Sequence, residues 1–381
     1  MSENSCKKIR ILHVVSALEI GGAMALLLNL HKKINTDLVQ LDYVSLHRGG
    51  QYDVLADSVK ALGGKIYYLP TLTGFNLLKV IKSWIQFFKN HPEYKIIHSH
   101  LRSYAALYLL IAKHFGLKTI IHSHNTKNDR GIGGIVKTVL QYPLRFVADY
   151  FLACSNEAGL WLFGKNVVKS PNYHVLKNAI DTTLFKFNQN TREEYRKKLN
   201  IPDSTKVFIN VGRFVDQKNH DFLLRLFAEI NKENNNTLLL LVGDGELRPQ
   251  IESQIDNLKI NSSVILLGAV QDVYNWFQVA DTFLFPSLWE GLGIVAIEAQ
   301  TAGLPCICSN YVPKEAAITE NCSFLPLEIS LWKEEALKSV NIPRKDCTSQ
   351  ARNAGYDAID SANWLTKFYM GIQSSKLEES Y

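Results

Sequence analysis

The chain has 381 residues, of which 46% are hydrophobic and 20% charged, and its formal net charge is +6. This length exceeds one ordinary hydrophobic core, and the composition is that of a soluble globular protein, so two domains are expected. No apolar run reaches the length of a membrane span, and residues 1–10 lack the apolar stretch of a signal peptide. We therefore expect a cytoplasmic protein.

The six cysteines have no spacing typical of a disulfide framework. Cys306 and Cys308 lie in an apolar run that predicts a buried strand, where packing is favoured over a metal or redox pair. Cysteines of this kind fit a reducing compartment, which agrees with a cytoplasmic location.

The charge is unevenly distributed. Residues 1–186 contain 23 Lys and Arg against 11 Asp and Glu, a net charge of +12, and the remainder has a net charge of −6. A basic half can attract an anionic membrane surface or a diphosphate-linked substrate. A solvated lysine-rich face explains the same charge equally well, so peripheral membrane contact is one of two interpretations.

In chain order, the first half alternates short apolar runs with amphipathic segments. The predicted strands are 11–15, 41–46, 65–69, 95–98, 119–122 and 150–153. The predicted helices are 23–33, 54–62, 77–89, 104–114 and 136–147. Strand–helix alternation over this length predicts a parallel, doubly wound sheet.

A polar stretch at 188–200 breaks the pattern, which then restarts. The predicted strands are 207–211, 238–242, 264–267, 282–285, 306–308 and 323–325. The predicted helices are 220–232, 247–258, 273–279, 295–301 and a last apolar stripe at 365–373. We predict an α/β fold with two Rossmann-like doubly wound domains that face a central cleft, where ligands of such sheets bind.

The domains are predicted at residues 1–186 and 187–359, with a C-terminal helix at about residues 360–381 packing back on the first domain.

The densest motif runs from Phe285 to Gln300 and follows a predicted strand. Gly291 and Gly293 let the backbone approach a ligand, and the helix that follows presents unpaired N–H groups that suit a phosphate. Glu290 and Glu298 can accept hydrogen bonds from sugar hydroxyls on either side of it. A glycine turn with a capping glutamate is the alternative, but it leaves Glu298 unexplained, so we favour a binding site.

A second motif, residues 210–220, also follows a strand. Arg213 and Lys218 stand five positions apart in one predicted loop, so both cations can converge on one pyrophosphate. Alone they would be ordinary surface charges, but beside the first motif phosphate binding is favoured.

Two weaker signals lie in the first half. Gly21 and Gly22 join a strand to a helix, which allows close approach of a phosphate or sugar, although any such loop can use glycine. The sequence His-Ser-His closes a strand at 98–100 and again at 122–124. No acid stands beside either pair, so no metal site is predicted. His124 is the better candidate to contact a sugar or handle a proton, and His98 and His122 are interpreted as structural.

Together these residues resemble the retaining glycosyltransferases of family 4, which have the GT-B fold of two Rossmann-like domains. The resemblance spans nearly the whole chain, and its main element is the pair of glutamates eight positions apart, Glu290 and Glu298. The His-Ser-His-Asn form at 122–125 and the segment 153–158 look most like the bacterial capsular and exopolysaccharide branch. Met24 and Ala179 depart from the family pattern, on the acceptor side and at the hinge.

The resemblance implies a role for each matching residue. Arg213 and Lys218 would hold the donor diphosphate, Glu298 the ribose and Glu290 the transferred sugar, while His124 would lie near the reacting sugar. The implied catalytic residues are Glu290, His124, Arg213 and Lys218. The implied donor-binding residues are Gly21, Gly22, Gly212, Arg213, Lys218, Glu290, Gly291, Leu292, Gly293, Ile294, Val295 and Glu298.

The predicted function is transfer of a hexosyl unit from a nucleotide diphosphate sugar, UDP-linked, to a saccharide or polyprenyl-diphosphate-linked acceptor in surface polysaccharide synthesis. The resemblance implies retention at the anomeric carbon. No Asp-x-Asp occurs, so no metal cofactor is expected and the cations and helix amides would stabilise the leaving diphosphate. No nucleic-acid partner is expected. The alternatives are an epimerase or hydrolase of the same fold and a non-catalytic sugar-nucleotide-binding protein.

Overall fold

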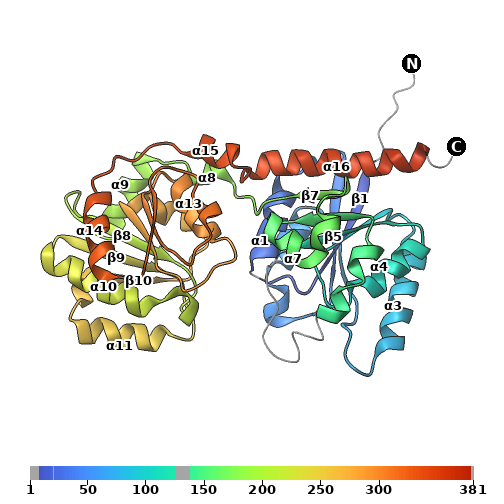
Figure 1. Cartoon of the computed structure of the whole chain (residues 1–381), viewed down its shortest axis with the longest axis horizontal. Helices are drawn as coiled ribbons and strands as arrows, with labels where there is room; N and C mark the ends of the chain where they lie inside the picture. Colours follow the sequence, from blue (N-terminus) through green and yellow to red (C-terminus); the bar gives the residue numbers. More distant parts are fainter. Residues whose placement is uncertain (1–7, 20, 125–137, 379–381) are drawn as a thin grey trace, which may run out of the picture. The chain divides into compact units, whose positions relative to one another are not determined.

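The computed structural model describes residues 8–19, 21–124 and 138–378 (Figure 1). The chain forms two compact units. The first comprises Met1–Ile180 and Asp357–Tyr381, and the second comprises Asp181–Tyr356. The sequence pattern placed the boundary after residue 186. In the structure the first unit ends at Ile180 and resumes at Asp357, and a parallel bridge joins these two residues.

The first unit is built on a seven-stranded sheet in the order β3-β2-β1-β4-β5-β6-β7, with every pairing parallel. Its strands are β1 (Ile9–Val15), β2 (Val39–Ser45), β3 (Ile66–Tyr68), β4 (Ile96–Ser99), β5 (Lys118–Ser123), β6 (Tyr150–Ala153) and β7 (Tyr173–Val175). Its helices are α1 (Gly22–Lys33), α2 (Ala56–Ala61), α3 (Leu77–Asn90), α4 (Ala105–His114), α6 (Leu144–Val147), α7 (Asn156–Val167) and α16 (Ala358–Glu378).

Alternation along the strands divides the core of the first unit between the two faces of its sheet. Leu12 and Val14 of β1 pack in one cluster with side chains of α3, α4, α6 and α7. Ile11 and Val15 pack in the other cluster with side chains of α1, α2 and α16. Successive side chains of a strand point to opposite faces, so an almost unbroken apolar run is what a sheet covered on both sides requires.

The second unit has a six-stranded sheet in the order β10-β9-β8-β11-β12-β13, again with parallel pairings. Its strands are β8 (Lys206–Val211), β9 (Thr237–Val242), β10 (Val264–Gly268), β11 (Thr282–Phe285), β12 (Cys306–Ser309) and β13 (Cys322–Leu325). Its helices are α8 (Thr182–Phe185), α9 (Gln189–Lys198), α10 (His220–Glu233), α11 (Arg248–Leu258), α12 (Val273–Val279), α13 (Ile294–Thr301), α14 (Ile329–Ser339) and α15 (Thr348–Asn353). In both sheets the strand order reverses beside the first strand, β1 or β8, which is where doubly wound folds bind ligands.

The polar stretch at 188–200 contains a helix, α9, and not the predicted break. Asn188 caps it by accepting a hydrogen bond from the Thr191 N–H at 3.1 Å. Arg192 and Arg196 then bond to the carboxylate of Asp281 at 2.6 and 3.0 Å. An arginine face held by hydrogen bonds has no apolar periodicity, which is why the hydrophobic pattern did not predict this helix.

The predicted helix at 136–147 is interrupted. Residues 138–141 are helical, a turn follows at Tyr142 and Pro143, and α6 then begins at Leu144; residues 136 and 137 lie outside the described residues. Pro143 has no N–H to donate to the preceding turn, so the helix cannot continue through it. In the part of the chain that the structure describes, no helix is long and apolar enough to cross a membrane.

Candidate functional site

The end of β8 and the loop that follows it are hydrogen-bonded to the neighbouring strands. Asn210 donates from Nδ2 to the Leu284 carbonyl at 2.7 Å, and the Gly212 N–H donates to the Val242 carbonyl at 2.9 Å. A Cβ at Gly212 would lie 3.0 Å from Cε of Lys218. Glycine at this position therefore lets the Lys218 side chain fold back over the end of the strand.

The loop between β11 and α13 is bound to the first loop by three hydrogen bonds. The Leu288 N–H donates to the Gln217 carbonyl at 2.8 Å, and Gln217 Nε2 donates to the Trp289 carbonyl at 2.8 Å. Asn219 Nδ2 donates to the Pro286 carbonyl at 3.2 Å. The two motifs singled out in the sequence thus form one structure.

Helix α13 begins directly after Gly293, which has a φ of +80°. A Cβ there would lie 2.9 Å from the ring of Phe285, so both the backbone conformation and the packing require glycine. The first turn of the helix follows, with backbone N–H groups that have no partner within the helix and a positive dipole end. These are properties of an anion-binding helix terminus.

Lys218 and Glu290 form an ion pair with Nζ and Oε1 2.6 Å apart, and their side chains are only 14% and 9% exposed. The same ammonium group lies 4.8 Å from the centre of the Phe285 ring. A largely desolvated pair of this kind is costly to break by removing one partner. Either partner can, however, exchange the other for a ligand group that carries the charge of the partner it replaces.

Glu298 lies in the second turn of α13 and lines one cavity together with Lys218 and Glu290. Burial disfavours its charged form and raises the pKa of its carboxyl to about 8, although part of the side chain remains accessible. A carboxyl group in this state is ready to gain hydrogen bonds from hydroxyl groups, which would favour its ionised form.

A cavity of about 370 Å³ lies at the carboxyl ends of β8 and β11 in the second unit. It is lined by Val211, Gly212, Arg213, Gln217, Lys218, Glu290, Gly293, Ile294, Val295 and Glu298. Val211 and Gln217 were not predicted, and Gly291 and Leu292 were predicted but do not line it. The Arg213 side chain is exposed and makes no hydrogen bond or ion pair with other described residues.

The other predicted site residues belong to the first unit. Gly21 and Gly22 stand at the start of α1, after β1, and among the described residues no atom lies within 4 Å of where a Cβ would be at either position. His124 directly follows β5 and is partly accessible. All three lie at the carboxyl edge of the sheet. Because the space around the two Cβ positions is open, packing among the described residues does not require glycine at either position.

His124 is part of a larger histidine cluster than the sequence suggested. Hydrogen-bond distances separate Nε2 of His124 from Nδ1 of His100 (2.8 Å), and Nε2 of His100 from Nδ1 of His13 (2.9 Å). His98 contacts Tyr369 of α16, and His122 stacks on His124 with ring centroids 4.1 Å apart. His13 was not among the predicted residues, although a histidine inside the apolar strand β1 was a visible signal.

Two triplets of these rings, His13–His98–His100 and His100–His122–His124, have nitrogens within 4.8 Å of one another. Two nitrogens that ligate one tetrahedral zinc ion are about 3.3 Å apart. The separations of 2.8 and 2.9 Å are instead those of hydrogen bonds, and neither triplet includes a carboxylate to balance a cation. The geometry therefore favours a hydrogen-bonded chain of neutral imidazoles.

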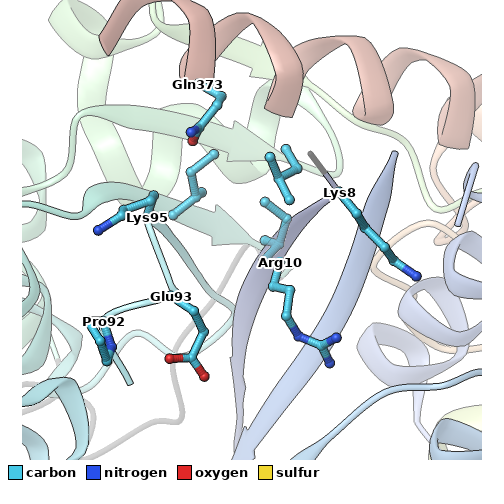
Figure 2. Close-up of a pocket in the computed structure, with 9 residues that line it drawn as sticks. Lys8, Arg10, Pro92, Glu93, Lys95 and Gln373 are labelled. Atoms are coloured by element: carbon cyan, nitrogen blue, oxygen red, sulfur yellow. The ribbon is translucent and has the colours of Figure 1, made fainter. Parts of the chain in front are cut away.

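A second hollow, of about 540 Å³, lies at the opposite edge of the first unit's sheet, at the amino ends of β1 and β4 (Figure 2). Its charged residues include Lys8, Arg10, Glu93 and Lys95. The guanidinium of Arg10 is bound to both oxygens of Asp42 at 2.6 Å. Ligands of doubly wound sheets bind at the carboxyl ends of the strands, so this hollow is not the predicted site.

Comparison with known proteins identifies the family. Residues 191–322 match the family model of the group 1 glycosyl transferases. The chain is 30% identical to EpsF of Bacillus subtilis (strain 168), which is named as a glycosyltransferase, over 96% of this chain and 97% of EpsF. It is 26% identical to the UDP-Gal:alpha-D-GlcNAc-diphosphoundecaprenol alpha-1,3-galactosyltransferase of Escherichia coli, over 97% and 98% of the two chains.

The fold is shared with solved glycosyltransferase structures. The crystal structure of Anabaena HepE in complex with UDP and glucose superposes with a TM-score of 0.71 at 16% identity, over 95% of this chain and 100% of HepE. The prediction of an α/β GT-B fold with two Rossmann-like units is thereby confirmed. By its similarity to EpsF over nearly its whole length, the chain belongs to the group 1 glycosyltransferases.

Proposed function

We propose that the protein transfers a hexosyl unit from a UDP-sugar to a hydroxyl group of a saccharide carried on a polyprenyl diphosphate, with retention at the anomeric carbon. The printed name of the Escherichia coli relative describes a transfer from UDP-galactose to a diphosphoundecaprenol-linked sugar, which supports this donor and acceptor class. HepE was crystallised with UDP and glucose, which supports the same nucleotide. The first unit would bind the acceptor and the second the donor.

The observation that carries the proposal is the convergence of Arg213, Lys218, Glu290 and Glu298 with the amino end of α13 in one cavity. Arg213 and the amides of α13 would bind the diphosphate directly. Lys218 would exchange Glu290 for phosphate, and the released Glu290 would then accept hydrogen bonds from the sugar. Glu298 would bind the ribose hydroxyls.

Transfer requires stabilisation of the negative charge that develops on the departing UDP. Each preorganised donor or cation aimed at that charge lowers the activation free energy by a few kcal/mol, on the order of 3. Arg213, Lys218 and the helix amides together would supply this stabilisation without a divalent metal ion. His124, in the first unit, would contact the reacting sugar or the acceptor.

A thermal-shift panel of UDP, GDP and their hexose derivatives tests donor binding, because a ligand that binds only the folded state raises its melting temperature. We expect UDP and at least one UDP-sugar to raise it, and GDP compounds to leave it unchanged. If no nucleotide raises the melting temperature at millimolar concentration, the donor assignment is wrong.

The reaction itself is tested with a labelled UDP-sugar in the presence and absence of a polyprenyl-diphosphate saccharide. Label in the lipid product supports a transferase. Free sugar or an isomerised donor supports the hydrolase or epimerase, and an unchanged donor supports a binding protein. The anomeric configuration of the product by NMR tests retention, and activity in EDTA tests independence from metal.

Peripheral membrane contact would bring the enzyme to its lipid-linked acceptor. Exposed apolar side chains gather between residues 139 and 146 of the first unit, where Val139 is 66% and Phe146 72% exposed. Arg145 lies over the Tyr142 ring in the same segment. Aromatic, aliphatic and cationic side chains in one segment are typical of surfaces that lie in a membrane interface.

We expect Phe146→Ser to reduce binding to anionic phospholipid vesicles at low salt by about threefold or more, because it removes one large apolar contact. Leu160→Ser is the matched control, since Leu160 is 44% exposed on α7 outside this segment. Equal binding by both variants and the unaltered protein in a vesicle co-sedimentation assay would exclude this surface.

A further inference from the structure

The residues on either side of Lys218 both donate side-chain hydrogen bonds to the loop between β11 and α13. Gln217 Nε2 donates to the Trp289 carbonyl at 2.8 Å, and Asn219 Nδ2 donates to the Pro286 carbonyl at 3.2 Å. Lys218 ends the short 3₁₀ turn that precedes α10, and it contacts the same loop through its ion pair. Three consecutive side chains of the loop after β8 therefore bond to the loop after β11.

The loop between β11 and α13 is hydrogen-bonded at each of the four residues that precede Glu290. The bonded groups are the carbonyls of Pro286, Ser287 and Trp289 and the N–H of Leu288. Gln217 and Asn219 supply three of these bonds, and the Ser309 hydroxyl at the end of β12 supplies the fourth. A loop bonded at every residue has little freedom to open, so the position of Glu290 relative to Lys218 depends on these bonds.

Asn219 has a left-handed backbone conformation, with a φ of +55°, at the position before α10. An asparagine at this position ordinarily caps the helix by accepting a hydrogen bond from an N–H of the first turn, but this side chain makes no such bond. Glycine would adopt the same backbone conformation with less strain. The backbone therefore does not require asparagine here, and what asparagine adds over glycine is the amide that donates to the Pro286 carbonyl.

The ion pair of Lys218 and Glu290 cannot hold the two loops together in the presence of donor, because it is the contact that the donor would replace. In the proposed function a phosphate takes the place of Glu290 at Nζ, and both charges must then keep their positions without a bond between them. A displacement of about 1 Å at a reacting centre is enough to lower a rate greatly. Only hydrogen bonds outside the ion pair can maintain this separation, and the Asn219 amide supplies the one on the α10 side of Lys218.

We infer that Asn219 is a positioning residue, which holds Lys218 and Glu290 at a fixed separation whether or not the two side chains are paired. Its amide bonds the loop of one charge to the loop of the other, and its left-handed backbone turns the chain from Lys218 into α10. The bond between the loops is a property of the second unit alone. Its consequence for sugar transfer rests on the proposed function, in which both charges contact the donor.

The variant Asn219→Gly tests the amide by itself, because glycine retains the left-handed backbone and removes the donor. Asn200→Gly is the matched control. Asn200 also has a left-handed backbone, with a φ of +53°, in the exposed turn after α9. Its side chain makes no hydrogen bond with any other residue that the structure describes, so the two variants share the same change of backbone freedom and differ in the lost bond.

Acetylation of lysine amines in the full-length protein, followed by mass spectrometry, measures the bond between the loops without enzymatic activity. The Lys218 side chain is 14% exposed and paired, whereas Lys232 on α10 is 71% exposed and serves as the internal reference. We expect Asn219→Gly to acetylate Lys218 at least about threefold faster relative to Lys232, because the loops open more often. Asn200→Gly should match the unaltered protein. A lower melting temperature of Asn219→Gly with an unchanged rate at Lys218 would show a merely structural role and overturn the inference.

Steady-state kinetics of sugar transfer supply a second readout. Asn219→Gly should lower kcat about tenfold and leave the KM for the donor within about threefold, because Arg213 and the amides of α13 still bind the diphosphate. Asn200→Gly should retain both values, and equal kcat in the two variants would overturn the positioning role. If the unaltered protein transfers no sugar, the proposed function fails, but acetylation still decides whether Asn219 holds Lys218 in place. The two failures are therefore distinguishable.

Discussion

The two cations of the second unit's cavity differ in what holds them. Lys218 is largely buried, pairs with Glu290 and lies against the Phe285 ring, so its removal would disturb the folded state as well as ligand binding. Arg213 is exposed and lines the same cavity without an ion pair to another described residue. A substitution of Arg213 therefore tests the proposed ligand binding with little effect on folding.

We expect Arg213→Ala to lower the turnover of sugar transfer by at least about tenfold, because it removes a charge that would stabilise the departing diphosphate in the proposed reaction. Its melting temperature should equal that of the unaltered protein. Arg225→Ala is the control, since Arg225 is exposed on α10 and pairs with Asp221 on the same helix. Steady-state kinetics compare the three proteins, and near-normal turnover in Arg213→Ala would remove this residue from the mechanism.

Glu298 predicts a dependence of stability on pH. Its pKa is about 8 in the folded protein against an ordinary value of 4.5, so the folded state holds the proton more tightly than the unfolded chain. The free energy of unfolding should therefore fall as the pH rises from 4.5 to about 8, and the full loss of stability is present above about pH 8.

Glu298→Gln has no proton to lose and should escape this penalty. Its melting temperature relative to the unaltered protein should increase by several degrees between about pH 6 and about pH 9, while its affinity for the nucleotide decreases. Glu252→Gln, at an exposed position on α11, is the control. Parallel melting curves of Glu298→Gln and the unaltered protein across this range would contradict the raised pKa.

At the scale of elements, the start of α13 depends on Gly293. Alanine there would have to adopt a φ of +80° and place its Cβ 2.9 Å from the Phe285 ring. We expect Gly293→Ala to destabilise the protein by about 1–3 kcal/mol and to weaken nucleotide binding, because it displaces the amides of the first turn.

Gly291→Ala is the matched control. Gly291 lies two residues earlier, no atom of the residues that the structure describes lies within 4 Å of its Cβ position, and its φ is outside the left-handed region. Urea denaturation and calorimetric titration with UDP compare the two variants. Equal effects of both substitutions would show that the turn at Gly293 does not position the helix.

Helix α9 shows how an element escapes detection in the sequence. Its buried residue is Arg196, which donates to the carbonyls of Val279, Pro202 and Thr205 as well as to Asp281. These partners are distant in sequence or lie in loops, and a run of charged residues gives no apolar stripe. Only the folded chain brings them together.

At the scale of the whole molecule, the first unit is completed by the far end of the chain. Helix α16 supplies Leu365, Tyr369 and Ile372 to the cluster that covers one face of the first sheet, beside α1. The second unit lies between these segments in sequence, so the first unit cannot finish its core until the last residues of the chain are available.

We expect Leu365→Ala to lower the free energy of unfolding of the first unit by about 2–5 kcal/mol, because Leu365 is fully buried. Lys367→Ala, two residues later on the exposed side of the same helix, should have an effect within about 0.5 kcal/mol. Denaturation followed by hydrogen exchange at β1 separates the first unit from the second. An effect of Leu365→Ala no larger than that of Lys367→Ala would show that α16 is not part of this core.

Local patterns in the sequence predict the two α/β units, most of their strands and the two loops that line the cavity of the second unit. Buried parallel strands need continuous apolar runs, and a phosphate-binding turn needs glycine and cations at short spacings, so both leave local traces. Only the folded chain pairs Lys218 with Glu290, raises the pKa of Glu298 by burial and places His13, His100 and Tyr369 in one cluster. These depend on burial and on contacts between residues up to 356 positions apart, which no local pattern records.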